Sequence, residues 1–205
     1  PDVTVVLPAF NASPYINEAI RSILNQTLKN FELIIINDGS TDDTLQKIHQ
    51  YQDNRIVVIN QTNTGLVESL NRGIALARAD LIARQDADDA SLPQRLEIQY
   101  QMFAQQPDLA LLGSSMVTID ENSLALNHHH VLIGNPEIRQ ELLVRSPFAH
   151  GSVMFRKETF SRAGGYRTDD WPAEDYGLWV RMSAYGRFAN IDEPLYRYRE
   201  NQRES

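Results

Sequence analysis

Residues 31–38 of the chain read FELIIIND, an apolar run that ends on an aspartate. Leu33 and the three isoleucines after it do not alternate with polar side chains, which is typical of a strand buried on both faces. Asp38 is followed by Gly39 and a polar turn that we expect to lead into a helix ending at about Gln50. A buried strand followed by a turn and a helix predicts a sheet with helices packed on it.

Further apolar runs lie on either side of this stretch, at residues 3–7, 55–60 and 81–85. The segments between the runs have helical patterns. Ser13 is expected to cap a helix with Pro14 in its first turn, and residues 65–78 form another helix. This alternation predicts an α/β fold with a mostly parallel central sheet flanked by helices, in which ligands bind beyond the carboxyl ends of the strands.

The second half of the chain is less regular. We expect helices at residues 91–106, after Asn135-Pro136 and at 173–184, and strands at 109–119 and 151–155. The run His128–His130 is expected to be a polar loop or a strand edge, because three consecutive side chains do not converge on one metal ion. No repeat or linker divides the 205 residues, so one domain is expected.

Composition excludes several classes of protein. The absence of cysteine rules out a disulfide framework and a thiolate metal site, and the net charge of −8 argues against a nucleic-acid partner. No stretch approaches the ~20 apolar residues of a transmembrane helix, and no signal peptide is visible. We expect a cytoplasmic protein, and peripheral association with the cytoplasmic face of the membrane stays open. The chain starts at Pro1 without methionine, which is consistent with a piece of something longer.

Carboxylates stand where ligands are expected to bind. Asp86 and Asp88 follow the strand at 81–85, and paired oxygen ligands of this kind suit Mg²⁺ or Mn²⁺. An acidic surface turn is the alternative reading. Asp38 is either a ligand for a base or ribose or a turn aspartate. Glu174 and Asp175 are either site residues or favourable charges in the first turn of a helix.

Ten segments in this order and spacing resemble the family 2 glycosyltransferases, which have the GT-A fold. They are VVLPAFN at 5–11, SILNQT at 22–27, FELIIINDGSTD at 31–42, Asn63, Gly65, LNRGI at 70–74, IARQDADD at 82–89, HGSVMFR at 150–156, GGY at 164–166 and AEDYGLW at 173–179. The resemblance runs through nearly the whole chain. It implies one Rossmann-like catalytic domain over residues 1–205, with a nucleotide-sugar-binding half at about 1–110 and an acceptor-binding half at about 111–205.

The resemblance also implies roles for individual residues. Asp38 would bind the base and ribose, in a pocket walled by Pro8, Phe10 and Asn11. Asp86 would contact the ribose and the metal, and Asp88 would be the principal metal ligand on the diphosphate.

On the acceptor side, the resemblance makes Asp175 the general base. Glu174 would shape the acceptor site beside it, and His150 and Trp171 would lie on the same side. The implied reaction moves a sugar from a nucleotide-diphosphate sugar, with a UDP-sugar as the expected donor, to a saccharide or lipid-linked acceptor. It would be a single displacement with inversion at the anomeric carbon, dependent on Mg²⁺ or Mn²⁺, in the synthesis of cell-surface polysaccharide or glycoconjugate.

The sequence departs from the family in two places. Residues 196–201 lack the histidine that in many relatives follows a Tyr-Arg pair and ligates metal, and the Gln-x-x-Arg-Trp motif of processive synthases is missing. The protein alone is therefore expected to hold metal weakly, and the polar run 200–205 is expected to be poorly ordered.

Three other kinds of protein are alternatives to a glycosyltransferase. A dinucleotide oxidoreductase needs a glycine-rich turn after the first strand, where this chain has residues 8–11, PAFN. A nucleotidyltransferase would need a glycine-rich loop with a basic residue. A non-catalytic sugar- or nucleotide-binding module would keep the base pocket without needing Asp175.

Overall fold

The computed structural model describes residues 1–200. Its strands are β1 Val3–Ala9, β2 Phe31–Asp38, β3 Ile56–Gln61, β4 Leu81–Arg84, β5 Ala90–Ser91, β6 Leu109–Ile119, β7 Ala125–His129, β8 Met154–Arg156 and β9 Arg187–Arg199. Its α-helices are α1 Ile16–Leu24, α2 Thr44–Ile48, α3 Leu66–Leu76, α4 Arg95–Gln105, α5 Asn135–Glu141, α6 Lys157–Arg162 and α7 Glu174–Met182. Short 3₁₀ helices lie at His150–Ser152, Thr168–Asp170 and Ser183–Tyr185.

All nine strands belong to one sheet, in the order β3-β2-β1-β4-β8-β6-β9-β5, with β7 paired to β6. The first four strands are parallel, as the sequence predicts, and Val5 lies between Leu33 of β2 and Ala83 of β4. Strand β8 is antiparallel to both β4 and β6, and the long β9 runs parallel to β6. The parallel half thus continues into a mixed half built from the second part of the chain.

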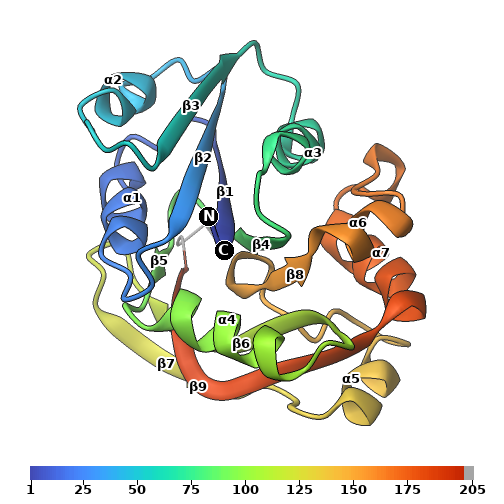
Figure 1. Cartoon of the computed structure of the whole chain (residues 1–205). Helices are drawn as coiled ribbons and strands as arrows, with labels where there is room; N and C mark the ends of the chain where they lie inside the picture. The colour runs from blue at the N-terminus through green and yellow to red at the C-terminus, as the bar shows by residue number, and fades with distance from the viewer. Residues whose placement is uncertain (201–205) are drawn as a thin grey trace.

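The sheet is covered on both faces (Figure 1). Alternate residues of the central strands point to opposite sides, so Val6 and Ile34 pack with apolar residues of α3, α5, α6 and α7. Val5 and Leu33 face the other way and pack with residues of α1, α2 and α4. Two cores therefore fix the central strands from both sides, and the carboxyl ends of those strands remain available for a site.

The predicted start of the first helix is wrong. Helix α1 begins at Ile16, and its N-cap is Tyr15, without a side-chain capping bond. The carbonyl of Ala12 accepts the N–H groups of both Tyr15 and Ile16, so Ser13 and Pro14 form a turn before the helix. Ser13 instead donates its backbone N–H to Asp42, which ties this turn to the loop after β2.

Two boundaries in the second half also differ from the prediction. The helix expected at 91–106 begins at Arg95, because Ser91 pairs with Tyr196 of β9 in a short strand. The strand expected at 151–155 begins at Met154, since a 3₁₀ turn occupies His150–Ser152. The first difference arises from pairing with a distant strand, which local sequence patterns do not report. The second arises from a local turn, in which Ser152 donates to the carbonyl of Ala149.

The histidine run lies at a sheet edge, one of the two predicted alternatives. His128 and His129 end the exposed strand β7, and His130 follows them. The His130 Nδ1 atom lies 2.9 Å from Asp192 Oδ1. Within residues 1–200, no helix is long and apolar enough to cross a membrane. Residues 201–205, which include most of the polar run expected to be poorly ordered, lie outside the described part.

Candidate active site

Three adjoining cavities lie at the carboxyl ends of β1, β2 and β4. The first, of about 320 Å³, contains Asp38, and the second, of about 310 Å³, contains Asn11. These two share Pro8 and Phe10. The third, of about 650 Å³, shares Asp86 and Asp88 with the second. The three cavities thus form a row along the edge of the sheet, called the trench below.

Asp38 lies at the inner end of this trench and is almost fully buried. One carboxylate oxygen accepts hydrogen bonds from Gln61 Nε2 at 2.7 Å and from the Thr64 N–H at 2.9 Å. The other accepts the Gly65 N–H at 2.9 Å. Burial raises the pKa of this carboxyl, but the hydrogen bonds outweigh it and hold the pKa below its ordinary value. Asp38 is therefore a fixed carboxylate that orders the loop before α3.

Phe10 and Asn11 follow β1 in the chain and have different roles. The Phe10 side chain is half exposed and lines both of the smaller cavities. Asn11 has a left-handed φ of 49°, and its side-chain oxygen accepts the N–H of Thr41 at 2.8 Å. Its side chain therefore holds the loop after β2 against the loop after β1, and it lines the middle cavity rather than the one that contains Asp38.

Asp86, at the end of β4, is paired with a buried guanidinium. The Arg84 side chain forms an ion pair with the Asp86 carboxylate, and the Asp86 N–H donates to the Tyr196 hydroxyl at 3.1 Å. Burial disfavours the charge on Arg84, but the Asp86 carboxylate raises the pKa of Arg84 above its ordinary value. Because Arg84 is buried and paired with Asp86, it fixes the position of the Asp86 carboxylate.

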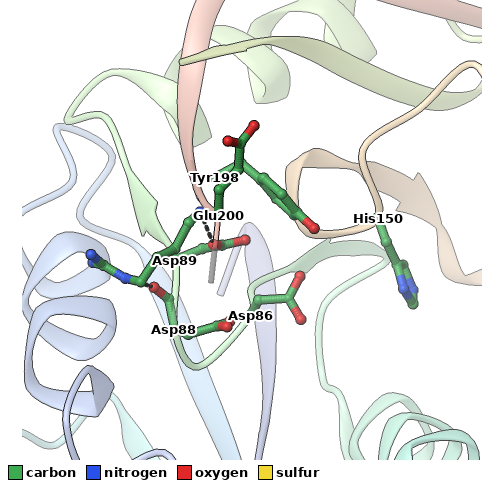
Figure 2. A pocket seen from close by; sticks show the side chains of 7 residues that line it. Asp86, Asp88, Asp89, His150, Tyr198 and Glu200 are labelled. Carbon is green, nitrogen blue, oxygen red and sulfur yellow. Dashed lines mark hydrogen bonds between the residues drawn. The ribbon is translucent and has the colours of Figure 1, made fainter. Parts of the chain in front are cut away.

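Asp88 and Asp89 complete the acidic loop, residues 86–89, and line the third cavity with His150, Tyr198 and other residues (Figure 2). Asp89 is buried, and one of its oxygens accepts the backbone N–H of Arg199 at 2.7 Å. Burial and the negative charge of Asp86 raise the pKa of Asp89 to about 8. Asp88 is the more exposed of the two and lies on the trench side of the loop.

His150 is neutral in its surroundings. Its Nε2 atom lies 2.8 Å from the Tyr166 hydroxyl, and its Nδ1 atom is 3.9 Å from Glu174 Oε1. Burial and the positive charge of Arg84 hold the pKa of His150 well below 6.5. His150 therefore contacts the acidic cavity on one side and the start of α7 on the other.

Glu174 and Asp175 begin α7 and differ in exposure. Glu174 is buried, and within residues 1–200 its Oε2 atom has no hydrogen-bond partner, whereas Asp175 is only half buried. Burial raises the pKa of both carboxyls above their ordinary values, Asp86 raises both further, and Arg84 opposes the shift. Both carboxylates thus lie within electrostatic range of the Arg84–Asp86 pair.

The trench collects most of the residues singled out in the sequence. Among the described residues, the cavity linings contain Pro8, Phe10, Asn11, Asp38, Asp86, Asp88 and His150. Glu174, Asp175 and the exposed Trp171 lie outside these linings.

Sequence reasoning missed Arg84, Tyr196 and Arg199. Arg84 could have been recognised from the sequence, because it is a charged residue in an otherwise apolar strand. Tyr196 and Arg199 lie in residues 196–201, where the sequence pointed only to a missing histidine, and their strand β9 was not predicted.

Comparison with known proteins decides the family. Residues 4–164 match the profile of the family described as glycosyl transferase family 2. The chain belongs to this family. Among its relatives is EpsE of Bacillus subtilis (strain 168), which is named a putative glycosyltransferase. EpsE is 37% identical over 209 residues, which cover 98% of this chain and 74% of EpsE. The O-antigen biosynthesis glycosyltransferase WbnJ of Escherichia coli is 34% identical, over 96% of this chain and 79% of WbnJ.

The fold of this family member matches solved structures. The crystal structure of S. aureus TarS 1-349 in complex with UDP-GlcNAc superposes with a TM-score of 0.81 at 19% sequence identity. The match covers 100% of this chain and 60% of the TarS chain, so the chain spans about three fifths of that length. This likeness confirms the predicted GT-A fold, and the family and its relatives establish that the chain is a glycosyltransferase.

Proposed function

We propose that this glycosyltransferase moves a sugar from a UDP-sugar to a saccharide or lipid-linked acceptor in cell-surface polysaccharide or glycoconjugate synthesis. The transfer is a metal-dependent single displacement with inversion. The observation that carries the proposal is the trench that joins the pocket of Asp38 to the carboxylates of Asp86 and Asp88. TarS binds UDP-GlcNAc, which supports a UDP-sugar donor, and the name of WbnJ supports a polysaccharide product.

The donor fits the trench with its base at the Asp38 end and its sugar at the His150 end. The pocket between Pro8, Phe10 and Asp38 offers apolar walls for a base and one carboxylate for a base or ribose donor group. Asp86 and Asp88 lie further along, where a diphosphate would follow the ribose. The larger cavity beyond them, next to His150, then receives the sugar and the acceptor.

The residues present fit a divalent cation such as Mg²⁺ or Mn²⁺. Such ions commonly bind through one or two carboxylates, with water and phosphate oxygens completing the shell. Asp88 and the Asp86 oxygen turned away from Arg84 can supply this part of the shell. Within residues 1–200, no group of three or more acidic, histidine or cysteine side chains converges as a metal site. The remaining ligands would therefore come from the diphosphate and water.

The chemistry follows from this arrangement. The bond between the anomeric carbon and the diphosphate oxygen breaks as the acceptor oxygen attacks from the opposite side, and the acceptor proton passes to Asp175. Asp88 would hold a cation, which when bound would supply positive charge to stabilise the leaving diphosphate. Asp175 suits the base better than Glu174, because it is the less buried of the two carboxylates.

Calorimetry and a turnover assay test the proposal together. Mn²⁺ should bind weakly to the protein alone and tightly in the presence of UDP, because the diphosphate completes the metal site. Release of UDP from a panel of UDP-sugars should require metal and stop in excess chelator. Asp88→Ala should abolish both the mutual effect of metal and UDP and nearly all turnover.

Two results would reject parts of the proposal. Full turnover in excess chelator would rule out the metal-dependent mechanism. Tight Mn²⁺ binding without nucleotide would show that further protein ligands exist, and His150 or the His128–His130 run would be the first places to look.

A further inference from the structure

Arg199, at the end of β9, forms hydrogen bonds to the acidic loop. Its side chain is fully buried, and its Nε–H donates to the backbone carbonyl of Asp88 at 2.7 Å. Its own backbone N–H donates to the Asp89 carboxylate at 2.7 Å. One residue thus bonds to the two last positions of the Asp86–Asp89 segment, and neither bond uses the Asp88 carboxylate.

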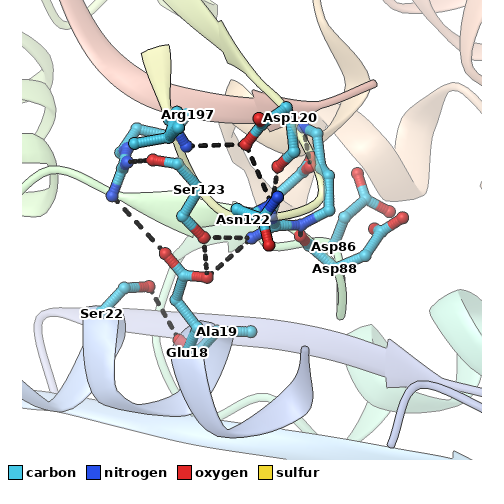
Figure 3. Close-up of polar contacts among 12 residues, drawn as sticks. Glu18, Ala19, Ser22, Asp86, Asp88, Asp120, Asn122, Ser123 and Arg197 are labelled. Carbon is cyan, nitrogen blue, oxygen red and sulfur yellow. Dashed lines mark hydrogen bonds and ion pairs between the residues drawn. The ribbon is translucent and has the colours of Figure 1, made fainter. Parts of the chain in front are cut away.

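The guanidinium of Arg199 is itself anchored in three directions. It donates to Glu18 Oε2 of α1 at 2.6 Å, and to the Asp120 carbonyl and the Ser123 hydroxyl at 2.6 and 3.1 Å. The Cζ atom of Arg199 lies 4.3 Å from the centre of the Tyr15 ring. Figure 3 shows Glu18, Ser123 and Asp120 gathered next to Asp88, with the contacts that join them. The acidic loop is therefore connected through Arg199 to α1 and to the turn after β6.

We infer that Arg199 is a positioning residue, which sets the orientation of Asp88 toward the metal and diphosphate while contacting neither. The inference rests on the proposed role of Asp88 in metal binding. Mutation of groups that hold metal ligands in place typically lowers metal affinity or activity by about 10- to 100-fold. Here the bond from Arg199 reaches the main chain of Asp88 and not its carboxylate.

The shape of the side chain is essential to this role. Arg199 uses its Nε, Nη1 and Nη2 atoms toward three different segments, which requires a planar, forked group. A lysine would keep the positive charge near Glu18 but has a single nitrogen. Arg199→Lys should therefore free the Asp88 carbonyl while leaving the net charge unchanged.

Arg197 provides a matched control. It lies on the same strand, pairs with the other oxygen of Glu18 at 3.5 Å and donates to the backbone carbonyl of Ser123. None of its described bonds reaches the Asp86–Asp89 segment. Arg197→Lys thus disturbs the same ion-pair cluster without disturbing the proposed hold on Asp88.

The experiment measures the affinity for UDP by calorimetry, in Mn²⁺ and in chelator, for the wild type and both variants. The dissociation constant for UDP in chelator, divided by that in Mn²⁺, reports how well the metal site is formed. A purely structural role would not change this ratio selectively. Arg199→Lys should lower the ratio by about 10- to 100-fold, the usual effect of losing a group that orients a metal ligand. UDP affinity in chelator should hardly change, and Arg197→Lys should keep the wild-type ratio.

The possible results separate the inference from the proposed function. An unchanged ratio in Arg199→Lys, or an equal fall in both variants, would overturn the role of Arg199 alone. No effect of Mn²⁺ on the wild type would overturn the metal assignment and this role with it. If Arg199→Lys does not fold, Glu18→Gln tests the inference instead. This change removes the carboxylate that anchors the Arg199 guanidinium, at a site that is more exposed than Arg199 itself. A several-fold fall in the ratio, beyond that of Arg197→Lys, supports the inference, and an unchanged ratio overturns it.

Discussion

Asp175 combines two properties at the scale of a single residue. It is a carboxylate that can take a proton, and burial raises its pKa above the ordinary value. Asp175→Asn keeps the size of the side chain but cannot accept a proton. We expect turnover at saturating donor to fall by roughly 10²–10⁴-fold, the usual contribution of general-base catalysis. Calorimetry should find UDP affinity unchanged, and a collapse of UDP binding with turnover intact would place Asp175 in the donor site instead.

The pH profile of the wild type gives a second check on Asp175. A base works only when ionised, so kcat/KM should rise with pH through the pKa of Asp175 and then level off. Because that pKa is raised, the rise should be centred above pH 3.8. A rate that is independent of pH across this acid range, in protein that remains folded, would contradict the assignment.

Asp38 is expected to act on both the nucleotide and the fold. Asp38→Ala leaves the buried N–H groups of Thr64 and Gly65 without their acceptor, so the free energy of unfolding should fall by about 1–3 kcal/mol. UDP affinity should fall as well, because the loop that lines the pocket is no longer held. Asp43→Ala, in the same turn but exposed, is the control. Chemical denaturation and calorimetry measure both effects, and wild-type UDP affinity in Asp38→Ala would remove Asp38 from the site.

The sequence predicted the residues of the trench better than the residues behind it. Asp38, Asp86 and Asp88 each follow an apolar strand, and a carboxylate at that place can be recognised from the order of the chain. Arg199 acts on Asp88 from a strand 111 positions away, so no local pattern connects the two. Whether Asp175 acts as the base remains a prediction, since the described cavity linings do not include it.

At the scale of an element, the 3₁₀ turn at His150–Ser152 packs closely against the acidic loop. A Cβ atom at Gly151 would lie 2.6 Å from Asp86 Oδ2 and still closer to the Tyr196 hydroxyl. Gly151→Ala should therefore displace Asp86 and lower turnover at least about 10-fold, consistent with the large effect of small misplacements in an active site. UDP-release kinetics measure this.

Gly134→Ala is the control for this change. A Cβ atom there would meet only side-chain atoms of Glu137 and Pro136, outside the trench. Turnover should stay at the wild-type level. If Gly151→Ala also kept wild-type turnover while folded, the close packing of this turn on Asp86 would have no functional meaning.

Element prediction succeeded where apolar runs were continuous and failed for β9. Residues 31–38 and 81–84 are buried along their whole length, and their type was evident. Strand β9 contains Asp192, Glu193 and Pro194 in its middle, where its register with β6 shifts. These residues break the alternation that marks a strand. Only pairing with β6, which is distant in sequence, makes the segment extended.

At the scale of the whole molecule, the ionised Asp175 carboxylate is expected to lower the free energy of unfolding at neutral pH. Burial raises the folded-state pKa of Asp175 above its unfolded value. The protonated form therefore contributes stability that is fully present below about pH 3.8, and it is lost as pH rises through the raised pKa. Asp175→Asn should thus melt at a higher temperature than the wild type at pH 7. The difference should shrink toward pH 4.

Thermal melting of both proteins across this pH range measures the difference. Asp169→Asn, an exposed carboxylate in the neighbouring 3₁₀ turn, should not show it. A lower melting temperature for Asp175→Asn at pH 7 would contradict the account of its burial.

The fold class itself could be predicted, because the alternation of apolar strands and amphipathic helices in the first half requires a sheet covered on both faces. The mixed second half could not, since β6, β8 and β9 are ordered by pairings between distant segments. The predicted division into halves at about residue 110 stays a prediction. The sheet continues through that point, because β4 pairs with β8.

The molecule as a whole is expected to transfer a sugar by one direct displacement. Proton NMR of a UDP-α-sugar turned over with Mg²⁺, with water as the acceptor when no other is known, tests this most directly. The β anomer of the released sugar should appear first, its formation should require Mg²⁺, and Asp175→Asn should slow it. First appearance of the α anomer would mean retention of configuration and would contradict the single displacement.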